Sequence, residues 1–234
     1  MSDYIRRKAV RAGFPEQKLR VHYTGIDFSR FSPSANIADR DKNLVLYVGR
    51  LIPYKGADHL VRAMSIVRQT CPAAHLIVIG DGTLRPAVEG LANQLNVPTQ
   101  CLGEQPPAII RTWLDRARVF CGPSVTQPDG SSEAFGNVFT EAQAMGVPVV
   151  SYRHGGIPET MLAGETGLLA EEGNHFDLAA QLSRFLRDDA LWMRAHETGM
   201  RWVRENFDVF KQTEKLESLY EEVLSSQARG GDAE

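Results

Sequence analysis

Glu133 and Glu141 are spaced as Glu-x7-Glu around a glycine-containing turn, Phe135-Gly136-Asn137-Val138. After the turn, apolar residues recur at the spacing of one helix face: Phe135, Val138, Ala142 and Met145. A helix that begins near Phe135 has free backbone N–H groups at its first turn, and these can bind an anion such as a diphosphate. The segment therefore predicts a site for a phosphorylated ligand.

The two carboxylates differ in their predicted surroundings. Glu141 falls on the edge of the apolar stripe, which predicts a half-buried acceptor for two vicinal hydroxyls such as those of ribose. A glutamate that snorkels or pairs with a lysine is the alternative. Glu133 lies in the preceding loop, where it is either a helix-capping acid or a contact for hexose hydroxyls. A glycosidase pair is disfavoured, because eight helical residues span about 12 Å, beyond the usual separation of such carboxylates.

Two cations follow the apolar run at residues 43–49. Arg50 and Lys55 lie in a loop flanked by Gly49 and Gly56, which permit tight turns. An ordinary solvated loop is the alternative, but cations that converge with a helix N-terminus suit a departing diphosphate. Gly103 and the following Glu104 end another apolar run, at residues 99–103, and are further candidate ligand contacts.

Other short motifs give weaker predictions. His154-Gly155-Gly156 ends a strand-like run, where its glycines would let the backbone approach a ligand. Asp39-Arg40-Asp41 lies in a polar stretch and is predicted to be a surface segment. The histidines show no metal-ligand spacing, so neither a metal site nor another cofactor is expected.

Composition excludes several classes of protein. The 234-residue chain has a net charge of -3 and a pI near 6.1, which argues against nucleic-acid binding. Its three cysteines have wide spacing, typical of reduced thiols in a cytoplasmic protein. No apolar run approaches the roughly 18 residues of a membrane span. The basic residues at 6–11 are interpreted as a solvated helix face, with peripheral contact at an anionic membrane as the alternative.

Alternating patterns predict an α/β fold. Six apolar runs read as strands, at residues 43–49, 75–80, 99–103, 119–124, 147–152 and 166–170. Helical periodicity occupies residues 57–69, 84–95, 107–115, 135–145, 176–187 and 190–204. Short loops between them predict a Rossmann-like, doubly wound parallel sheet, which binds ligands at the carboxyl ends of its strands.

The predicted organisation has four parts. Residues 1–42 form a helix at 3–12, a strand at 19–25 and a linker, and residues 43–206 form the Rossmann-like domain. A C-terminal helix occupies 207–225, with a disordered tail at 226–234.

Four motifs occur in the order found in one enzyme family: G-R-x4-K-G (49–56), E-x-F-G-x4-E-A (133–142), G-x-P-V-V (146–150) and G-G-x-P-E (155–159). With TGIDFSRF (24–31), they make the chain resemble the C-terminal, donor-binding half of retaining GT-B glycosyltransferases of family 4. The resemblance implies that Arg50 and Lys55 hold the diphosphate of a nucleotide sugar without a metal. It further implies that Glu141 binds the ribose, and that Glu133 with the turn at 135–138 contacts the transferred sugar.

One feature departs from this family. Its members have an N-terminal Rossmann-like domain that binds the acceptor and supplies a catalytic histidine, and we expect that domain to be missing from this chain. The expectation is thus a donor-binding half of a hexosyltransferase, as a fragment, a truncated product or one subunit of a split enzyme, inactive alone. The segments at 131–142 and 153–159 most resemble enzymes of surface-polysaccharide assembly, with a glycan or lipid-linked acceptor. The alternatives are a non-enzymatic nucleotide-sugar-binding module and half of a GT-B sugar-nucleotide epimerase.

Overall fold

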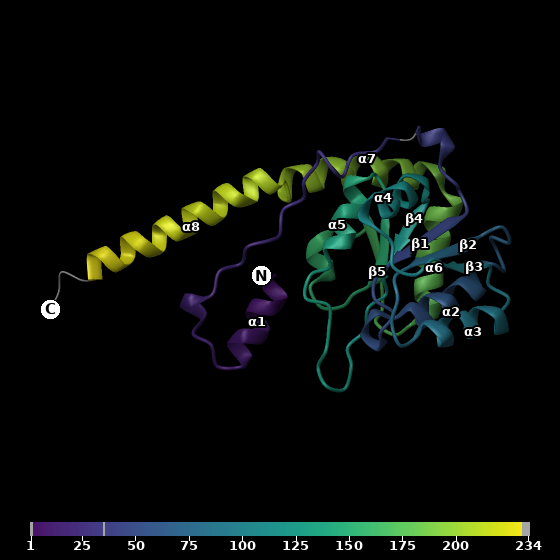
Figure 1. Cartoon of the computed structure of the whole chain (residues 1–234), viewed down its shortest axis with the longest axis horizontal. Helices are drawn as coiled ribbons and strands as arrows, with labels where there is room; N and C mark the ends of the chain where they lie inside the picture. The colour runs from purple at the N-terminus through teal and green to yellow at the C-terminus, as the bar shows by residue number, and fades with distance from the viewer. Residues whose placement is uncertain (1, 35, 231–234) are drawn as a thin grey trace.

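Six parallel strands form one sheet in the order β3-β2-β1-β4-β5-β6 (Figure 1). The computed structural model describes residues 2–34 and 36–230, with side chains to residue 225. The strands are β1 (Leu44–Val48), β2 (His75–Ile79), β3 (Thr99–Cys101), β4 (Val119–Cys121), β5 (Val149–Tyr152) and β6 (Gly167–Ala170). The chain builds outwards from β1 to β3, then continues with β4 on the other side of β1. The strand order therefore reverses between β1 and β4.

Helices cover both faces of this sheet (Figure 1). On one face lie α2 (Ala57–Val67), α3 (Arg85–Gln94) and α6 (His175–Arg187), and on the other α4 (Pro107–Arg116) and α5 (Asn137–Ala144). Strand β1 serves both layers, because Val45 and Tyr47 pack in the first and Leu44 and Leu46 in the second. A strand buried on both faces needs a continuous apolar run, and this is the pattern at residues 44–48. The predicted Rossmann-like α/β fold is confirmed.

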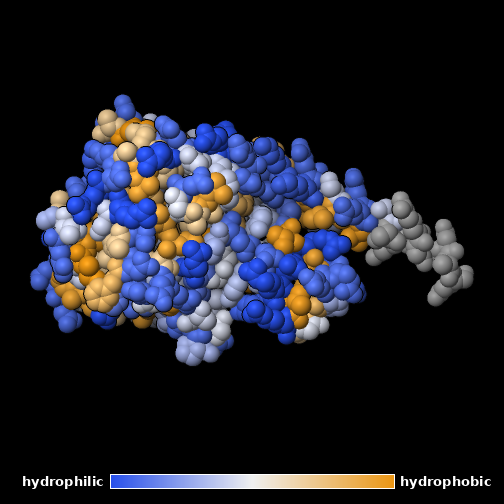
Figure 2. Space-filling view, turned by 180° about the vertical axis from the view of Figure 1, so that it is seen from behind, coloured by the Kyte–Doolittle hydropathy of each residue, from blue (hydrophilic) through white to orange (hydrophobic). Residues whose placement is uncertain are grey.

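Two further helices follow the sheet. Helix α7 (Asp189–Asn206) packs on the core through Trp192 and Ala195. Helix α8 (Val209–Gly230) projects from the body of the molecule (Figure 1), and Figure 2 shows hydrophobic residues scattered among hydrophilic ones on this side of the molecule. Its exposed apolar side chains are Phe210, Tyr220, Val223 and Leu224. No helix in the described part of the chain is both long and apolar enough to cross a membrane.

The termini differ from the prediction in two places. Helix α8 continues past the predicted boundary at 225, because the sequence contains no helix breaker before Gly230. The remainder of the predicted tail, residues 231–234, lies outside the described residues. The predicted strand at 19–25 is wrong: among the described residues no strand pairs with this segment, and the isolated bridge beside it joins Ile26 to Asp208. The predicted helix at 3–12 is present as α1 (Asp3–Arg11).

Arg40 corrects the surface assignment of residues 39–41. Its side chain is buried, and its guanidinium donates to the carbonyls of Leu114 (2.9 Å), Ala117 (3.1 Å) and Met145 (2.5 Å). These carbonyls end helices α4 and α5, whose last C=O groups have no intrahelical partner. Burial lowers the pKa of Arg40 to about 10. Arg40 therefore fastens the linker before β1 to the layer that carries α5.

Candidate functional site

A cleft of about 690 Å³ opens beside the carboxyl ends of β1 and β4, where the strand order reverses. Open α/β sheets bind ligands at such a switch point, since the loops from the two strands diverge there. The cleft is lined by Ser2, Ile5, His22, Tyr23, Thr24, Val48, Gly49, Lys55, Glu133, Ala134, Phe135, Gly136, Asn137, Val138 and Glu141. Residues from three distant parts of the chain thus meet at one place.

Most of the candidate residues named from the sequence line this cleft: Gly49, Lys55, Glu133, Phe135, Gly136, Asn137, Val138 and Glu141. Arg50 does not. Its side chain is exposed, and Nη2 donates to the hydroxyl of Tyr54 (3.1 Å) in the loop that carries Lys55.

Gly103 and Glu104 also lie outside the cleft. They follow β3, which is separated from β1 by β2, so the loop after β3 is displaced from the switch point. Glu104 is exposed, whereas Gly103 is buried and its carbonyl accepts from the N–H of Gly80 (2.8 Å). The structure therefore separates this pair from the other candidates.

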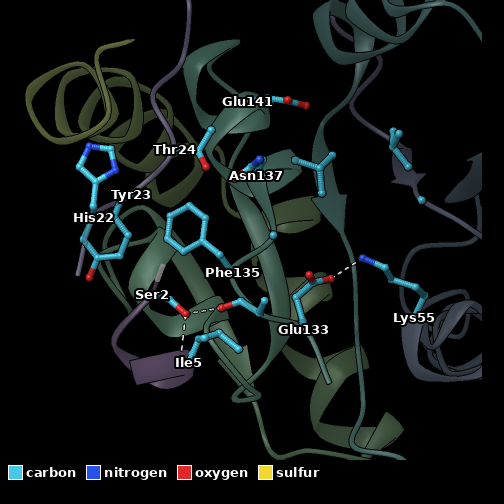
Figure 3. A pocket seen from close by; sticks show the side chains of 15 residues that line it. Ser2, Ile5, His22, Tyr23, Thr24, Lys55, Glu133, Phe135, Asn137 and Glu141 are labelled. Carbon is cyan, nitrogen blue, oxygen red and sulfur yellow. Dashed lines mark hydrogen bonds and ion pairs between the residues drawn. The ribbon is translucent and has the colours of Figure 1, made fainter. Parts of the chain in front are cut away.

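Lys55 and Glu133 form an ion pair across the cleft (Figure 3). The two side chains are 20% and 12% exposed, respectively, so both charges are largely removed from water. The Lys55 ammonium also lies 5.3 Å from the centre of the Tyr54 ring. An anionic ligand that enters the cleft must therefore compete with Glu133 for Lys55.

The N-terminus of α5 forms another wall. The helix begins at Asn137, later than the predicted start at Phe135, because Gly136 adopts φ 90° and is its N-cap. A Cβ at Gly136 would lie 2.7 Å from the Phe139 ring, so both the backbone angle and the packing favour glycine. No side chain caps this helix, and the first intrahelical hydrogen bond runs from the N–H of Phe139 to the carbonyl of Gly136 (3.0 Å). The N–H groups of Asn137 and Val138 precede it and have no intrahelical acceptor. They can bind an anion in the cleft.

Glu141 lies one helix turn further along α5 (Figure 3). Its side chain is half-buried, as the edge of the apolar stripe predicts, and burial raises the pKa of its carboxyl. No cation among the described residues forms an ion pair with it. The predicted alternative of a lysine partner is therefore not seen, and Glu141 can accept hydrogen bonds from a ligand.

The N-terminal segment supplies cleft residues that the sequence analysis missed. Ser2 Oγ donates to the carbonyl of Ala134, and Glu159 accepts from the N–H groups of Asp3 (2.7 Å) and Tyr4 (2.8 Å). Tyr23 donates to the same carboxylate (2.9 Å). Ser2 and Asp3 resemble a helix start, but nothing in the sequence pairs that start with a residue more than 150 positions away.

Gly155 and Gly156 correct a further prediction. A Cβ on Gly155 would lie 2.2 Å from the Glu133 carbonyl oxygen, and one on Gly156 would lie 2.0 Å from that of Ala134. The glycines therefore allow a close approach of two protein segments, rather than of a ligand. No group of three or more His, Cys, Asp or Glu residues within 2–34 and 36–230 is arranged to hold a metal ion.

Comparison with known proteins agrees with this architecture. Residues 29–202 match the family described as glycosyl transferases group 1. The chain is 31% identical over 191 residues to the putative colanic acid biosynthesis glycosyltransferase WcaL of Escherichia coli K12, covering 81% of this chain and 47% of that protein. It is 33% identical over 192 residues to the amylovoran biosynthesis glycosyltransferase AmsK of Erwinia amylovora, with the same coverage of each. The chain belongs to the group 1 glycosyltransferase family.

Solved structures show the same fold. Anabaena Alr3699/HepE in complex with UDP and glucose superposes with a TM-score of 0.83 at 21% identity, over 94% of this chain and 61% of that one. Sucrose-phosphate synthase from Thermosynechococcus elongatus gives 0.79 at 26% identity, over 95% and 57%. The sheet is therefore the Rossmann-like type found in GT-B glycosyltransferases. The chain spans about half the length of the curated relatives it matches.

Proposed function

We propose that this chain is the donor-binding, C-terminal half of a retaining glycosyltransferase of family 4 that transfers a hexose from a nucleotide sugar. One observation carries the proposal: Lys55, the uncapped start of α5, Glu133 and Glu141 line a single cleft at the switch point of the sheet. A cation and a helix N-terminus suit a diphosphate, and the two carboxylates suit hydroxyls on either side of it.

The donor would lie along α5. Its diphosphate would contact Lys55 and the N–H groups of residues 136–138, its ribose Glu141 and its hexose Glu133. Arg50, on the loop of Lys55, is proposed as a second cation for the diphosphate. When the bond between the anomeric carbon and the diphosphate oxygen breaks, the electron pair stays on the diphosphate. Lys55 and the helix N-terminus would stabilise that charge, so the proposed transfer uses no metal.

The acceptor side is proposed to come from an N-terminal GT-B domain. The relatives are about twice as long as the matched region, which is consistent with a two-domain enzyme. Two of them are named for colanic acid and amylovoran biosynthesis, so we propose a role in surface-polysaccharide assembly with a glycan or lipid-linked acceptor.

A calorimetric panel of UDP-, GDP- and ADP-sugars, each with its free nucleoside diphosphate, tests the site. For the base that the protein binds, Glu141→Gln should weaken the binding of both the nucleotide sugar and the nucleoside diphosphate, because both contain ribose. Glu133→Gln should weaken the binding of the nucleotide sugar only. Each loss should be about 10- to 100-fold, the scale of hydrogen bonds to charged groups. Glu104→Gln is the control, since Glu104 is exposed and lies outside the cleft, and its affinities should equal those of the wild type.

Two results would overturn the proposal. If no nucleotide sugar bound, the cleft would not be a donor site. Equal losses for both ligands in both glutamate variants would show that the donor is oriented differently. Transfer is tested separately, by adding the N-terminal half of a relative to this chain. Binding without turnover in every combination would favour the nucleotide-sugar-binding module over the enzyme.

A further inference from the structure

The peptide backbone at Glu133 is held on both sides by the segment that follows β5. The carbonyl of Glu133 accepts from the N–H of Gly156 (3.0 Å), while its own N–H donates to Nε2 of His154 (3.0 Å). Gly155 and Gly156 make this approach possible, because a Cβ on either would overlap the facing carbonyl oxygens. His154 contributes its side chain to this contact, whereas Gly156 contributes its backbone N–H.

The two ring nitrogens of His154 have different roles. The side chain is 1% exposed, and Nδ1 lies 3.2 Å from a carboxylate oxygen of Glu172 and 3.3 Å from Thr126 Oγ1. Since the Glu133 amide is a donor, Nε2 must be unprotonated, and Nδ1 must carry the hydrogen that it donates to Glu172. A protonated imidazolium has no acceptor and could not hold the Glu133 amide.

Glu172 fixes this arrangement from the end of β6. Its carboxylate accepts from the N–H of Thr126 (2.5 Å) as well as from His154. Burial acts to raise the pKa of Glu172, but these hydrogen bonds outweigh it and the pKa is lowered. An ionised acceptor at Nδ1 keeps the hydrogen on that nitrogen. A line of contacts thus runs from Glu172 through His154 and Glu133 to Lys55, across the carboxyl edge of the sheet.

We propose that His154 is a positioning residue that holds the Glu133 backbone, so that the carboxylate is aimed into the cleft at the transferred sugar. The aim toward the sugar rests on the function proposed above. His154 does not line the cleft, and both of its ring nitrogens are engaged by protein groups. A direct ligand contact is therefore not its role. A histidine that only filled space would need neither hydrogen bond.

Two substitutions separate the two ring nitrogens. His154→Gln places an amide oxygen near the position of Nε2 and keeps an acceptor for Glu133. His154→Asn keeps a polar group near the position of Nδ1 but is too short to reach the Glu133 amide. In 15N NMR, hydrogen exchange of the Glu133 amide should be about tenfold faster in His154→Asn and near wild type in His154→Gln. This measurement needs no ligand.

The ligand experiment uses the same variants. The affinity for the nucleotide sugar should fall about tenfold in His154→Asn, whereas the affinity for the nucleoside diphosphate should not change. In His154→Gln both affinities should stay near those of the wild type. Glu133→Gln is measured beside them as the variant that removes the carboxylate itself. If the wild type binds no nucleotide sugar, the proposed function fails and the positioning role falls with it, while the exchange comparison still decides whether His154 holds the loop.

The wild-type protein gives a readout that does not depend on how the variants fold. An N–H···N hydrogen bond transmits a scalar coupling, so the Glu133 amide nitrogen should couple to Nε2 of His154. Absence of that coupling, or equal Glu133 exchange in all three proteins, would overturn the inference. The inference would also be overturned if His154→Asn showed faster exchange but bound the nucleotide sugar as tightly as the wild type, while Glu133→Gln bound it more weakly.

Discussion

Replacing Lys55 with methionine should weaken both the fold and the binding of nucleoside diphosphates. Lys55 and Glu133 are 20% and 12% exposed, so the burial of this ion pair is intermediate. Surface pairs contribute at most about 1 kcal/mol to stability, whereas breaking a buried pair costs about 3–5 kcal/mol. We therefore expect a loss of about 2 kcal/mol in the free energy of unfolding, since Glu133 keeps its charge without a partner. Affinity should fall by about 1.5–3 kcal/mol, or roughly 10- to 150-fold, because a charge-assisted contact to the phosphates is lost.

The double variant Lys55→Met with Glu133→Gln separates the two effects. Removing the unpaired carboxylate should recover most of the stability, measured by urea unfolding, but not the affinity, measured by calorimetry. Lys42→Met is the control, because Lys42 is 67% exposed and pairs with Asp189 (2.8 Å) on the surface. It should change neither quantity by more than about 0.5 kcal/mol. Unchanged diphosphate affinity in Lys55→Met would refute the assignment of this cation.

Three further predictions concern stability and assembly. Burial raises the pKa of Glu141, so its protonated form favours folding, and this contribution to stability is lost as the pH rises through that pKa. Glu141→Gln should therefore have a higher melting temperature than the wild type at pH 7.5, and the difference should vanish near pH 4. Arg40→Met should cost about 2–4 kcal/mol in urea unfolding, because three helix-end carbonyls lose their donor; a change below about 0.5 kcal/mol would contradict this. The exposed apolar residues of α8 should cause concentration-dependent self-association in sedimentation, which Tyr220→Lys with Leu224→Lys should reduce; a monomeric wild type at high concentration would argue against it.

The core elements could be predicted because each carries its own pattern. A strand buried on both faces needs an unbroken apolar run, and residues 44–48 provide it without reference to the rest of the chain. The place of the cleft follows from the parallel order, because carboxyl ends of strands share one edge. Lys55, Glu133 and the turn at 135–138 could therefore be assigned to one site from strand ends alone.

The remaining features depend on contacts between distant segments. Residues 19–25 have a strand-like composition, yet no strand in the part of the chain that the structure describes pairs with them. The burial of Arg40 depends on where α4 and α5 end, and the sequence around residue 40 does not encode it. In the G-G-x-P-E motif, a glycine pair predicts a close approach but not the approaching group, which proved to be the Glu133 backbone. Gly103 and Glu104 shared the sheet edge with the other candidates, but the width of β2 separates them from the cleft.

The two carboxylates of the cleft differ in the partners that they have before a ligand binds, and this difference affects how a donor would bind. No cation in the described ranges pairs with Glu141, whose pKa is raised by burial alone, so ribose hydroxyls could donate to it without breaking an ion pair. Glu133 is satisfied by Lys55, and a diphosphate that draws Lys55 away would leave a largely buried carboxylate without a donor. Hydroxyls of the hexose would then donate to Glu133 in place of the Lys55 ammonium. The sugar and the diphosphate of one donor would therefore favour each other's binding, whereas a free nucleoside diphosphate would leave Glu133 unsatisfied. Such a site would hold the donor more tightly than the free nucleotide, which would help the nucleotide to leave once the hexose has been transferred.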